Sequence, residues 1–205
     1  RHGSALELEG EGYAEISDHN SLDLTNSLTI EAWIFVKDYN STIVSKGIKD
    51  GNYNLAIAYE SAGKRLWFFG QGITCSGAPC QSNEIPNLFN EWHHVAVTYN
   101  RGALKFYVDG ELEGTKTIAS SLTPNTASVY IGKYQGTTPP TPFKGKLDSV
   151  AIYNTALRPA EIKSHAKKTY TDSCSADGKV VEYYCGVAET SDETITKIKP
   201  VHDAY

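Results

Sequence analysis

The feature that most constrains the fold of this chain is one repeating sequence pattern that extends from Ala5 to Tyr153. Short runs rich in Val, Ile, Tyr, Phe, Trp and Thr alternate with turn signals made of Gly, Asn, Asp and Pro. This pattern is typical of an antiparallel β-sandwich, in which many short strands follow one another with turns between them. The predicted strands are 27–36, 41–45, 53–59, 65–69, 93–99, 104–108, 128–131 and 144–153.

The run Ser27–Val36 predicts a strand in the interior of a sheet. Leu28 and Ile30 fall on one face of it, and Trp33 and Phe35 fall on the other. Side chains alternate between the two faces of a strand, so both faces of this strand carry bulky groups. We therefore expect neighbours on both sides and cover on both faces.

Composition sets the broad class. With 205 residues, of which 40% are apolar, the chain is long enough to bury the core of one domain and to carry a small appendage. A net charge of -5 argues against the basic face that nucleic-acid binding needs. No apolar run reaches about 18 residues, which predicts no membrane span. Because methionine is absent, we expect a piece of a longer product, and residues 1–4 resemble a vector remnant.

One helix is predicted after the strands, from Arg158 to about Lys168, with proline in its first turn and lysines in its last. We therefore expect the sandwich to occupy residues 5–168. Residues 169–205 differ in composition from the rest of the chain, because they contain two strand-like runs and no long apolar stretch. They are interpreted as a disulfide-pinned hairpin that either packs on the sandwich or leads to a neighbouring domain.

The four cysteines form two local pairs, Cys75 with Cys80 and Cys174 with Cys185. Such pairing in a chain with few cysteines favours two disulfides and an oxidising compartment. A four-cysteine zinc site is the alternative, but it normally has two short knuckles in which two to four residues separate the cysteines, and only the first pair is near that spacing. A glycosylation sequon at residues 40–42 is compatible with secretion.

Three segments together resemble the laminin-G-like domains of the concanavalin A-like jelly-roll superfamily. They read LTIEAWI, then EWHHVAVTYN with LKFYVDG, then VYIG with FKGKLDSVAIYNTALRPAEI, and residues 5–16 match the first hairpin of that family. The resemblance covers about residues 5–166. It implies a two-sheet antiparallel jelly roll with Trp33 and Trp92 at core positions. It does not decide function, because members include lectins, carbohydrate-binding modules, adhesion domains and glycan-cleaving enzymes.

The resemblance also implies a structural calcium ion. Many members bind one through backbone carbonyls and an aspartate at the position of Asp148, and their N-terminal partner, often Asp-Gly, is Glu9-Gly10 in this chain. Calcium takes about six to eight oxygen ligands, so carbonyl groups would complete the set. The alternative is that Asp148 only hydrogen-bonds the end of its strand.

A catalytic function has no recognisable motif in this chain. Glycoside hydrolases need two carboxylates on one face, and the glucanases of the superfamily carry them in a Glu-x-Asp strand that has no counterpart here. The nearest string, Glu-Leu-Glu at residues 111–113, is interpreted as a solvated strand end. His93 and His94 are adjacent and point to opposite faces, so they cannot form one chelating or acid–base pair.

A sugar site needs aromatic rings that pack on C–H patches, and amides or carboxylates that satisfy hydroxyl groups. Trp67 is the one tryptophan outside the core positions of the family, and strand parity places the loops after residues 36 and 132 at the same end. Plainer interpretations are a core tryptophan, loop tyrosines without a ligand, and a disulfide strap that only stabilises. The candidate ligand contacts are Trp67, Tyr39, Asn40, Tyr134, Gln135, and the amides Gln71, Gln81 and Asn83 of the cysteine-braced loop.

We therefore predict a non-catalytic carbohydrate-binding module of a larger secreted or cell-surface protein. Its partners would be a polysaccharide or glycoconjugate glycan and the neighbouring domains of the parent protein. One alternative is a protein–protein adhesion module, which predicts a flat apolar patch and no aromatic-lined groove. The other is a glycan-cleaving enzyme with carboxylates on different strands, for which Glu31 with Glu60 or Glu84 is the first pair to test.

Overall fold

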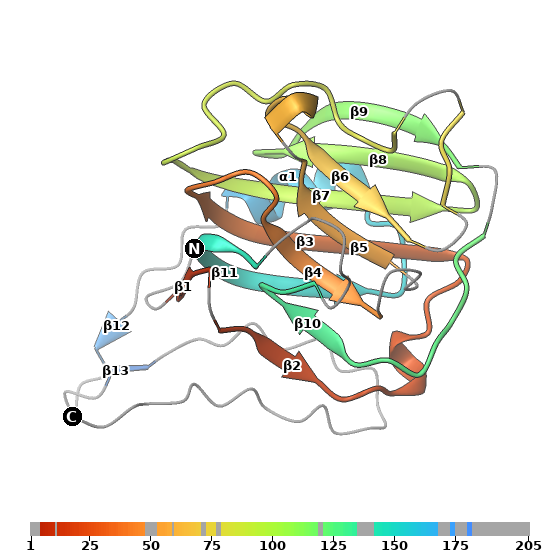
Figure 1. Cartoon of the computed structure of the whole chain (residues 1–205), viewed down its shortest axis with the longest axis horizontal. Helices are drawn as coiled ribbons and strands as arrows, with labels where there is room; N and C mark the ends of the chain where they lie inside the picture. Colours follow the sequence, from red (N-terminus) through yellow and green to blue (C-terminus); the bar gives the residue numbers. More distant parts are fainter. Residues whose placement is uncertain are drawn as a thin grey trace.

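Two antiparallel sheets pack face to face in this protein (Figure 1). The computed structural model describes residues 5–10, 12–47, 53–58, 60–70, 73–76, 79–118, 121–134 and 142–167, and the backbone of 173–174 and 180–181. The order of the six-stranded sheet is β1 (Leu6–Glu9), β11 (Lys144–Tyr153), β3 (Ser27–Val36), β7 (Trp92–Asn100), β8 (Ala103–Val108) and β9 (Glu111–Thr117). The order of the five-stranded sheet is β2 (Ala14–Ile16), β10 (Val129–Ile131), β4 (Thr42–Lys46), β5 (Tyr53–Ile57) and β6 (Leu66–Phe69).

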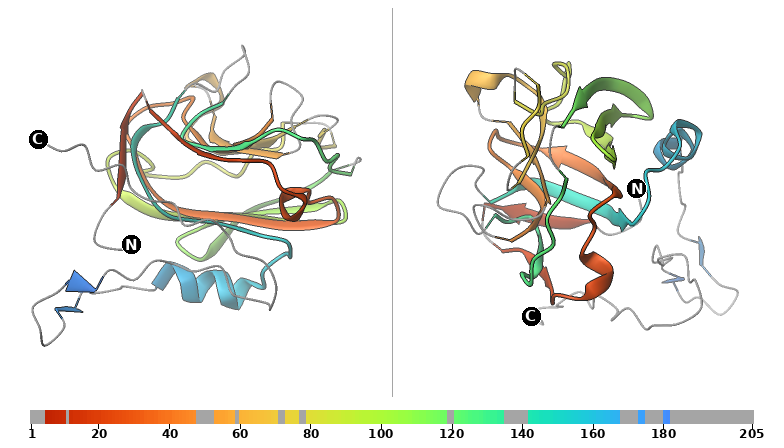
Figure 2. Two further views of the ribbon diagram at one scale, coloured as in Figure 1. Left: turned by 90° about the horizontal axis from the view of Figure 1, so that it is seen from below. Right: turned by 90° about the vertical axis from the view of Figure 1, so that its right-hand side faces the viewer.

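This arrangement confirms the all-β jelly-roll sandwich predicted from the sequence. Seen edge-on, the two sheets form two layers, and helix α1 (Pro159–Lys167) lies outside the six-stranded layer (Figure 2). Two short 3-10 turns, η1 (Asn20–Leu22) and η2 (Glu60–Ala62), lie outside the strands. No helix in the described part of the chain is long and apolar enough to cross a membrane.

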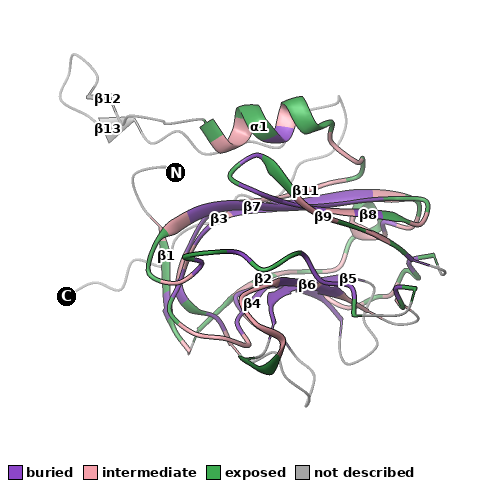
Figure 3. Ribbon diagram, turned by 90° about the horizontal axis from the view of Figure 1, so that it is seen from above, coloured by how far each residue is buried: buried purple, intermediate pink, exposed green. Residues whose placement is uncertain are grey.

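The hydrophobic core fills the space between the two sheets (Figure 3). Leu28, Ile30 and Ile34 of β3 point into it from one layer, and Leu55 of β5 and Phe68 of β6 from the other, all with no exposed surface. As predicted, β3 is an interior strand, since it pairs with β11 on one side and with β7 on the other.

Trp33 and Trp92 do not lie in this core, contrary to the expectation from the family. Both are half-buried on the outer face of the six-stranded sheet. The Trp33 ring lies 5.6 Å from the ring of His94, and the Trp92 ring lies 5.9 Å from that of Phe35. The reason is parity: the even-numbered residues of β3 fill the core, so Trp33 and Phe35 must face outward.

The first two strands do not form the hairpin that the resemblance predicted. β1 pairs with β11 in the six-stranded sheet, whereas β2 pairs with β10 in the five-stranded sheet. Gly10 and Gly12 lie between them with φ of +86° and +79°, a backbone region that glycine enters without steric cost. The chain therefore crosses from one layer to the other at a point where the sequence had suggested a simple reversal.

Helix α1 covers part of the outer face of the six-stranded sheet. Its one buried residue, Ile162, packs on Ala96 and Tyr107. The backbone N–H of Arg158 donates to the side chain of Glu161, so this N–H group just before the helix has a hydrogen-bond partner. In the predicted hairpin region, β12 (Ser173–Cys174) pairs antiparallel with β13 (Val180–Val181). The predicted bridge between Cys174 and Cys185 lies outside the side chains that the structure describes.

Candidate functional site

The outer face of the five-stranded sheet brings aromatic and amide side chains into two rows. Residues directly opposite each other in antiparallel strands point to the same face. Leu55 and Phe68 point into the core, so their neighbours along the strands point outward. The first row is Gln81, Trp67, Ala56 and Thr42, and the second is Phe69, Asn54, Ser45 and Tyr130.

Three aromatic rings lie in contact on this face. The ring centroids of Trp67 and Phe69 are 4.5 Å apart with a tilt of 30°, and those of Phe69 and Tyr134 are 5.4 Å apart and nearly perpendicular. Trp67 and Phe69 are half-buried, whereas Tyr134 is only 7% exposed. The first two rings therefore offer partly accessible apolar surface, and the third supports them.

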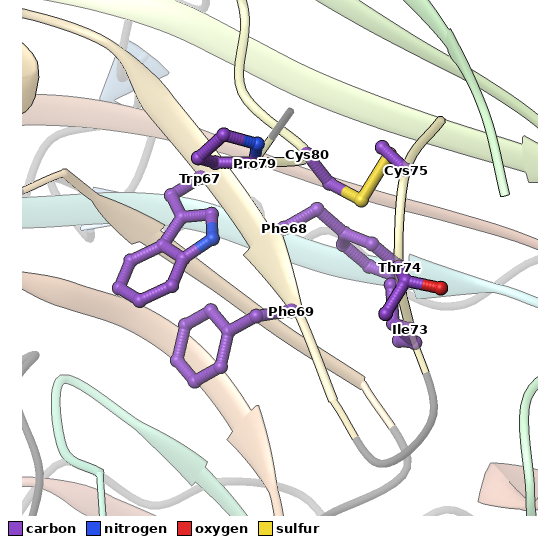
Figure 4. Close-up of a pocket in the computed structure, with 8 residues that line it drawn as sticks. All are labelled: Trp67, Phe68, Phe69, Ile73, Thr74, Cys75, Pro79 and Cys80. Carbon is purple, nitrogen blue, oxygen red and sulfur yellow. A yellow bond between two sulfur atoms is a disulfide. The ribbon is translucent and has the colours of Figure 1, made fainter. Parts of the chain in front are cut away.

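A pocket of about 270 Å³ lies at β6, beside these rings (Figure 4). Trp67 and Phe69 extend to one side of β6 and Phe68 extends to the other, as alternation along the strand requires. The lining is mostly apolar, which suits the face of a ring better than it suits a charged group. The lining residues are Trp67, Phe68, Phe69, Ile73, Thr74, Cys75, Pro79 and Cys80.

The predicted disulfide between Cys75 and Cys80 is present and forms one wall of this pocket. The carbonyl of Cys80 accepts a hydrogen bond from the amide of Phe68, and Cys75 forms a β-bridge with Ile118 just after β9. The loop is thus tied to both sheets. A wall that is fixed before binding loses little conformational entropy when a ligand arrives.

Three buried polar atoms belong to the same face. In the described ranges, Thr42 Oγ1, Asn54 Oδ1 and Gln81 Nε2 have no hydrogen-bond partner. All three residues are at least nine-tenths buried, and the amide of Asn54 is held because its Nδ2 donates to the Phe69 carbonyl at 3.0 Å. An unsatisfied buried polar atom costs about 1–3 kcal/mol, and because these atoms have almost no exposed surface, a ligand on this face does not reach them unless neighbouring groups move.

The sequence of residues 8–163 matches the family model described as the concanavalin A-like lectin/glucanases superfamily. The chain belongs to this superfamily. A search of curated protein sequences found no significant match.

Solved structures agree with this assignment. Domain 4 of AbnA, a GH43 extracellular arabinanase from Geobacillus stearothermophilus in complex with arabinotriose, is 23% identical with a TM-score of 0.61, over 80% of this chain and 76% of that one. A putative carbohydrate-binding protein from Bacteroides ovatus is 25% identical with a TM-score of 0.60, and the match covers 88% of this chain but only 52% of that protein. Domains LG4-5 of the mouse laminin α1 chain share 13% identity over 77% of this chain and 44% of that one, with a TM-score of 0.57. At their identities, the arabinanase and laminin domains support the fold alone.

Within this superfamily fold, the predicted loop residues fall into separate groups. The β3–β4 turn and the segment after β10 do lie at one end, since the amide of Gly132 donates to the Ile43 carbonyl. Their side chains diverge, however, because Tyr39 packs edge-on against Phe89 at 4.6 Å while Tyr134 packs against Phe69. Asn40 is half-buried at the same turn with a φ of 57°.

The predicted amides also differ in position. Gln81 lies beside Trp67 on the outer face, whereas the side chain of Asn83 is exposed and its backbone N–H donates to the backbone carbonyl of Glu113 on β9. Gln71 and Gln135 lie outside the described residues. Sequence reasoning missed Asn54 as a candidate, although its position between the apolar residues 53 and 55 predicts an outward side chain.

The residues expected to bind calcium do not converge. Glu9 pairs with Lys144 across the strands, and Asp148 lies four residues further along β11, about 13 Å away. Glu9 forms an ion pair with Lys37, and the Lys144 side chain lies against Gly10. Asp148 accepts a hydrogen bond from Ser149 at a β-bulge. As placed, these residues do not fit one shared calcium site, and the ion stays a prediction from the resemblance.

The two adjacent histidines have separate partners. His93 Nδ1 lies 2.7 Å from Asp109 Oδ2 and its Nε2 lies 3.1 Å from the Asn87 carbonyl, an arrangement that needs a proton on both nitrogens. The hydrogen bond to Asp109 raises the pKa of His93. Burial alone would raise the pKa of Asp109, but hydrogen bonds from His93 and from the amide of His94 outweigh it and lower that pKa.

We expect Asp109→Asn to destabilise the fold by about 1–2 kcal/mol, because the carboxylate is half exposed and its hydrogen bonds are partly screened. Asparagine tolerates the φ of 51° at this turn, so the substitution removes charge and spares the backbone. The raised His93 pKa gives stability that is full below the ordinary value of about 6.5 and is lost as pH rises through the raised pKa of the folded state. The lowered Asp109 pKa gives stability that is full above the ordinary value of about 3.8 and is lost as pH falls through the lowered pKa of the folded state. Denaturant unfolding from pH 3 to pH 9 should therefore show the largest difference between variant and wild type between these limits, and a flat difference would contradict the pairing.

Glu31, proposed from the sequence as one half of a catalytic pair, is buried beneath α1 on the outer face of the six-stranded sheet. It is 5% exposed, and Oε1 lies 2.8 Å from the Tyr153 hydroxyl and 2.9 Å from His165 Nδ1. His94 Nε2 lies 3.6 Å from its other oxygen, and burial lowers the pKa of this histidine. The contacts of Glu31 therefore join the helix to the sheet.

The proposed carboxylate partners of Glu31 lie elsewhere. Glu60 begins η2, which follows β5 of the five-stranded sheet, and Glu84 lies near Gly63 at the end of that turn. The Glu-Leu-Glu string at 111–113 begins edge strand β9, where Glu111 is exposed and forms an ion pair with Lys163. The structure does not bring Glu31 together with Glu60 or Glu84.

Proposed function

We propose that this chain is a non-catalytic carbohydrate-binding module, and that it binds glycan on the outer face of the five-stranded sheet. The observation that carries the proposal is the partly accessible ring pair of Trp67 and Phe69, which borders an apolar pocket. Ring faces pack on the C–H patches of a sugar, and amide groups exchange hydrogen bonds with its hydroxyls.

Two further facts support this assignment. The putative carbohydrate-binding protein from Bacteroides ovatus and the arabinanase domain solved with arabinotriose share this fold. In the described ranges, the exposed large hydrophobic residues, Leu6, Tyr13 and Leu112, belong to different segments, with Leu6 and Leu112 on opposite edge strands of the six-stranded sheet. They do not form the flat apolar patch that a protein–protein adhesion module would need.

The parent protein, in this proposal, is secreted or displayed on the cell surface. The disulfide between Cys75 and Cys80 favours an oxidising compartment, where such bonds form and persist. A glycan ligand would be met in the same compartment.

The test is binding of the purified protein to a panel of soluble polysaccharides and to a glycan array. We expect at least one glycan to bind, and Trp67→Ala to weaken that binding by about tenfold or more, since buried aromatic contacts dominate such interfaces. Because Trp67 lies at the site, its intrinsic fluorescence should change on binding, and affinity can be measured by titration.

Trp92→Ala is the matched control. It removes the same side chain from a half-buried position on the other sheet, so it carries a similar folding cost with no contact to the site. Its affinity should equal that of wild type. Equal loss in the two variants, or no binding to any glycan, would contradict the proposal, and release of reducing ends from a bound polysaccharide would contradict the non-catalytic assignment.

A further inference from the structure

The pocket beside Trp67 and Phe69 has an accessible mouth and a buried floor (Figure 4). Both of these rings are half-buried, so part of each can be reached from solvent. The other lining residues that are half-buried or exposed are Ile73, Thr74 and Pro79. The lining residues that are at most 8% exposed are Phe68, Cys75 and Cys80. The first group therefore forms the mouth, and the second forms the floor.

The pocket offers few hydrogen-bonding groups to a ligand. None of its eight described lining residues is charged, and Thr74 carries the one hydroxyl among them. Two of the backbone carbonyls are already engaged, because Cys80 accepts from the amide of Phe68, and Phe69 accepts from the side chain of Asn54. A sugar hydroxyl that entered the pocket would lose hydrogen bonds to water and find few replacements. A methyl group would lose none and would bury apolar surface, which is favourable.

Size and rigidity make the pocket selective. Its volume of about 270 Å³ is below the roughly 300–1,000 Å³ of sites for drug-sized ligands, so it suits one sugar unit or one substituent. The disulfide fixes its wall, because it joins Cys75, which forms a β-bridge with Ile118, to Cys80, which is hydrogen-bonded to β6. A wall held in this way cannot easily rearrange to solvate a polar group. The pocket should therefore discriminate between ligands that differ in a single small group.

We propose that this pocket receives a methyl group of the glycan, so that the ligand contains acetylated or deoxy sugars. The sugar ring packs on Trp67 and Phe69, and the methyl group enters the pocket between β6 and the disulfide. This inference rests on the proposed function and adds to it the class of sugar. Acetylated and deoxy sugars share the chemistry that matters here, an apolar methyl group at the edge of a polar ring, and the experiment distinguishes them.

The experiment titrates the full chain with pairs of ligands that differ only in the group that carries the methyl. The first pairs are chito-oligosaccharides against cello-oligosaccharides of the same length, and methyl fucoside against methyl galactoside. Each further methyl-bearing glycan that binds on the array is paired in the same way. In at least one pair, the methyl-bearing member should bind about tenfold tighter or more. If the acetylated pair responds, an N-formyl analogue, which keeps the amide and lacks the methyl, should bind about as weakly as the cello-oligosaccharide.

Thr74→Phe tests where the methyl group binds. Thr74 is exposed and lines the pocket, so a ring at this position should fill the pocket with little effect on folding. Affinity for the methyl-bearing ligand should fall by about tenfold, to that of its partner, and affinity for the partner should not change. Ser76→Phe is the matched control, since Ser76 is exposed in the same loop and is not among the described lining residues. It should keep the wild-type preference.

Several outcomes would overturn the methyl pocket. They are equal affinity within every pair, an N-formyl analogue that binds as tightly as the acetylated ligand, and a wild-type preference in Thr74→Phe. An array on which every bound glycan lacks a methyl group would overturn it as well. None of these results contradicts the proposed function, because Trp67→Ala should weaken both members of any pair that binds. The proposed function fails separately, if no glycan binds at all.

Discussion

Gly145→Ala should destabilise the sandwich by more than about 4 kcal/mol, the largest effect expected for any single substitution proposed for this protein. Gly145 lies in β11 opposite Val36 with a φ of +137°. A Cβ atom at this position would overlap the backbone carbonyl of Phe35 and would lie 3.2 Å from the Phe143 ring. The collision is with backbone in the middle of a sheet, so relief requires that β11 and β3 separate. Soluble yield and urea unfolding measure the loss.

Gly63→Ala is the control for this prediction. Gly63 also has a positive φ, of +80°, but a Cβ atom there would meet nothing closer than 3.8 Å. The control therefore isolates the cost of the backbone dihedral, about 1–2 kcal/mol, from the cost of the collision. Equal effects of the two substitutions, or a Gly145→Ala variant within about 1 kcal/mol of wild type, would contradict the sheet register described above.

Asp18→Ala should cost about 2–4 kcal/mol of folding free energy, because it leaves a buried ammonium without its main partner. The side chain of Lys46 has no exposed surface, and its Nζ forms an ion pair with Asp18 and donates to the Ala127 carbonyl at 2.9 Å. Asp23 remains 3.7 Å away, so the charge keeps one weaker partner. Urea unfolding at neutral pH measures the effect.

The double variant Asp18→Ala with Lys46→Met separates charge from packing. Methionine fills a volume similar to that of lysine and brings no charge, so the double variant should recover at least about half of the loss. A double variant that is less stable than Asp18→Ala would mean that the ammonium group of Lys46, through the Ala127 carbonyl and Asp23, still stabilises the fold when Asp18 is absent.

The strands and their order along the chain were predictable from the sequence because they depend on local signals. Alternation in β3 and turn residues such as Asp109-Gly110 act over a few neighbours, and the bounds of the strands that were predicted differ from the observed ones by only one or two residues. The edge strand β9 was not among the predicted strands; only its start was interpreted, as a solvated strand end. The Cys75–Cys80 bridge is equally local, since five positions separate the two residues.

The errors occurred where the answer depends on which strand lies beside which. β1 and β2 were expected to form a hairpin, but each finds its partner more than 100 residues away, on β11 and β10. Trp33 was assigned to the core, although its own strand shows alternation, because the sequence does not show which of two bulky faces turns inward. Tyr39 and Tyr134 do come to one end of the sandwich, yet they pack on different rings.

The sequence by itself determined a sandwich of short strands with one helix after them. It did not determine which tryptophan lies outside the core, because Trp33, Trp67 and Trp92 are all half-buried outside it. Only the tertiary structure decided that Trp67 and Phe69 share a face with Asn54, Tyr130 and the exposed Tyr13, and that Glu31 lies beneath α1. The physical reason is that hydrophobic alternation acts within a strand. The candidate site depends instead on register between strands, which is set by long-range pairing and by the packing of the core as a whole.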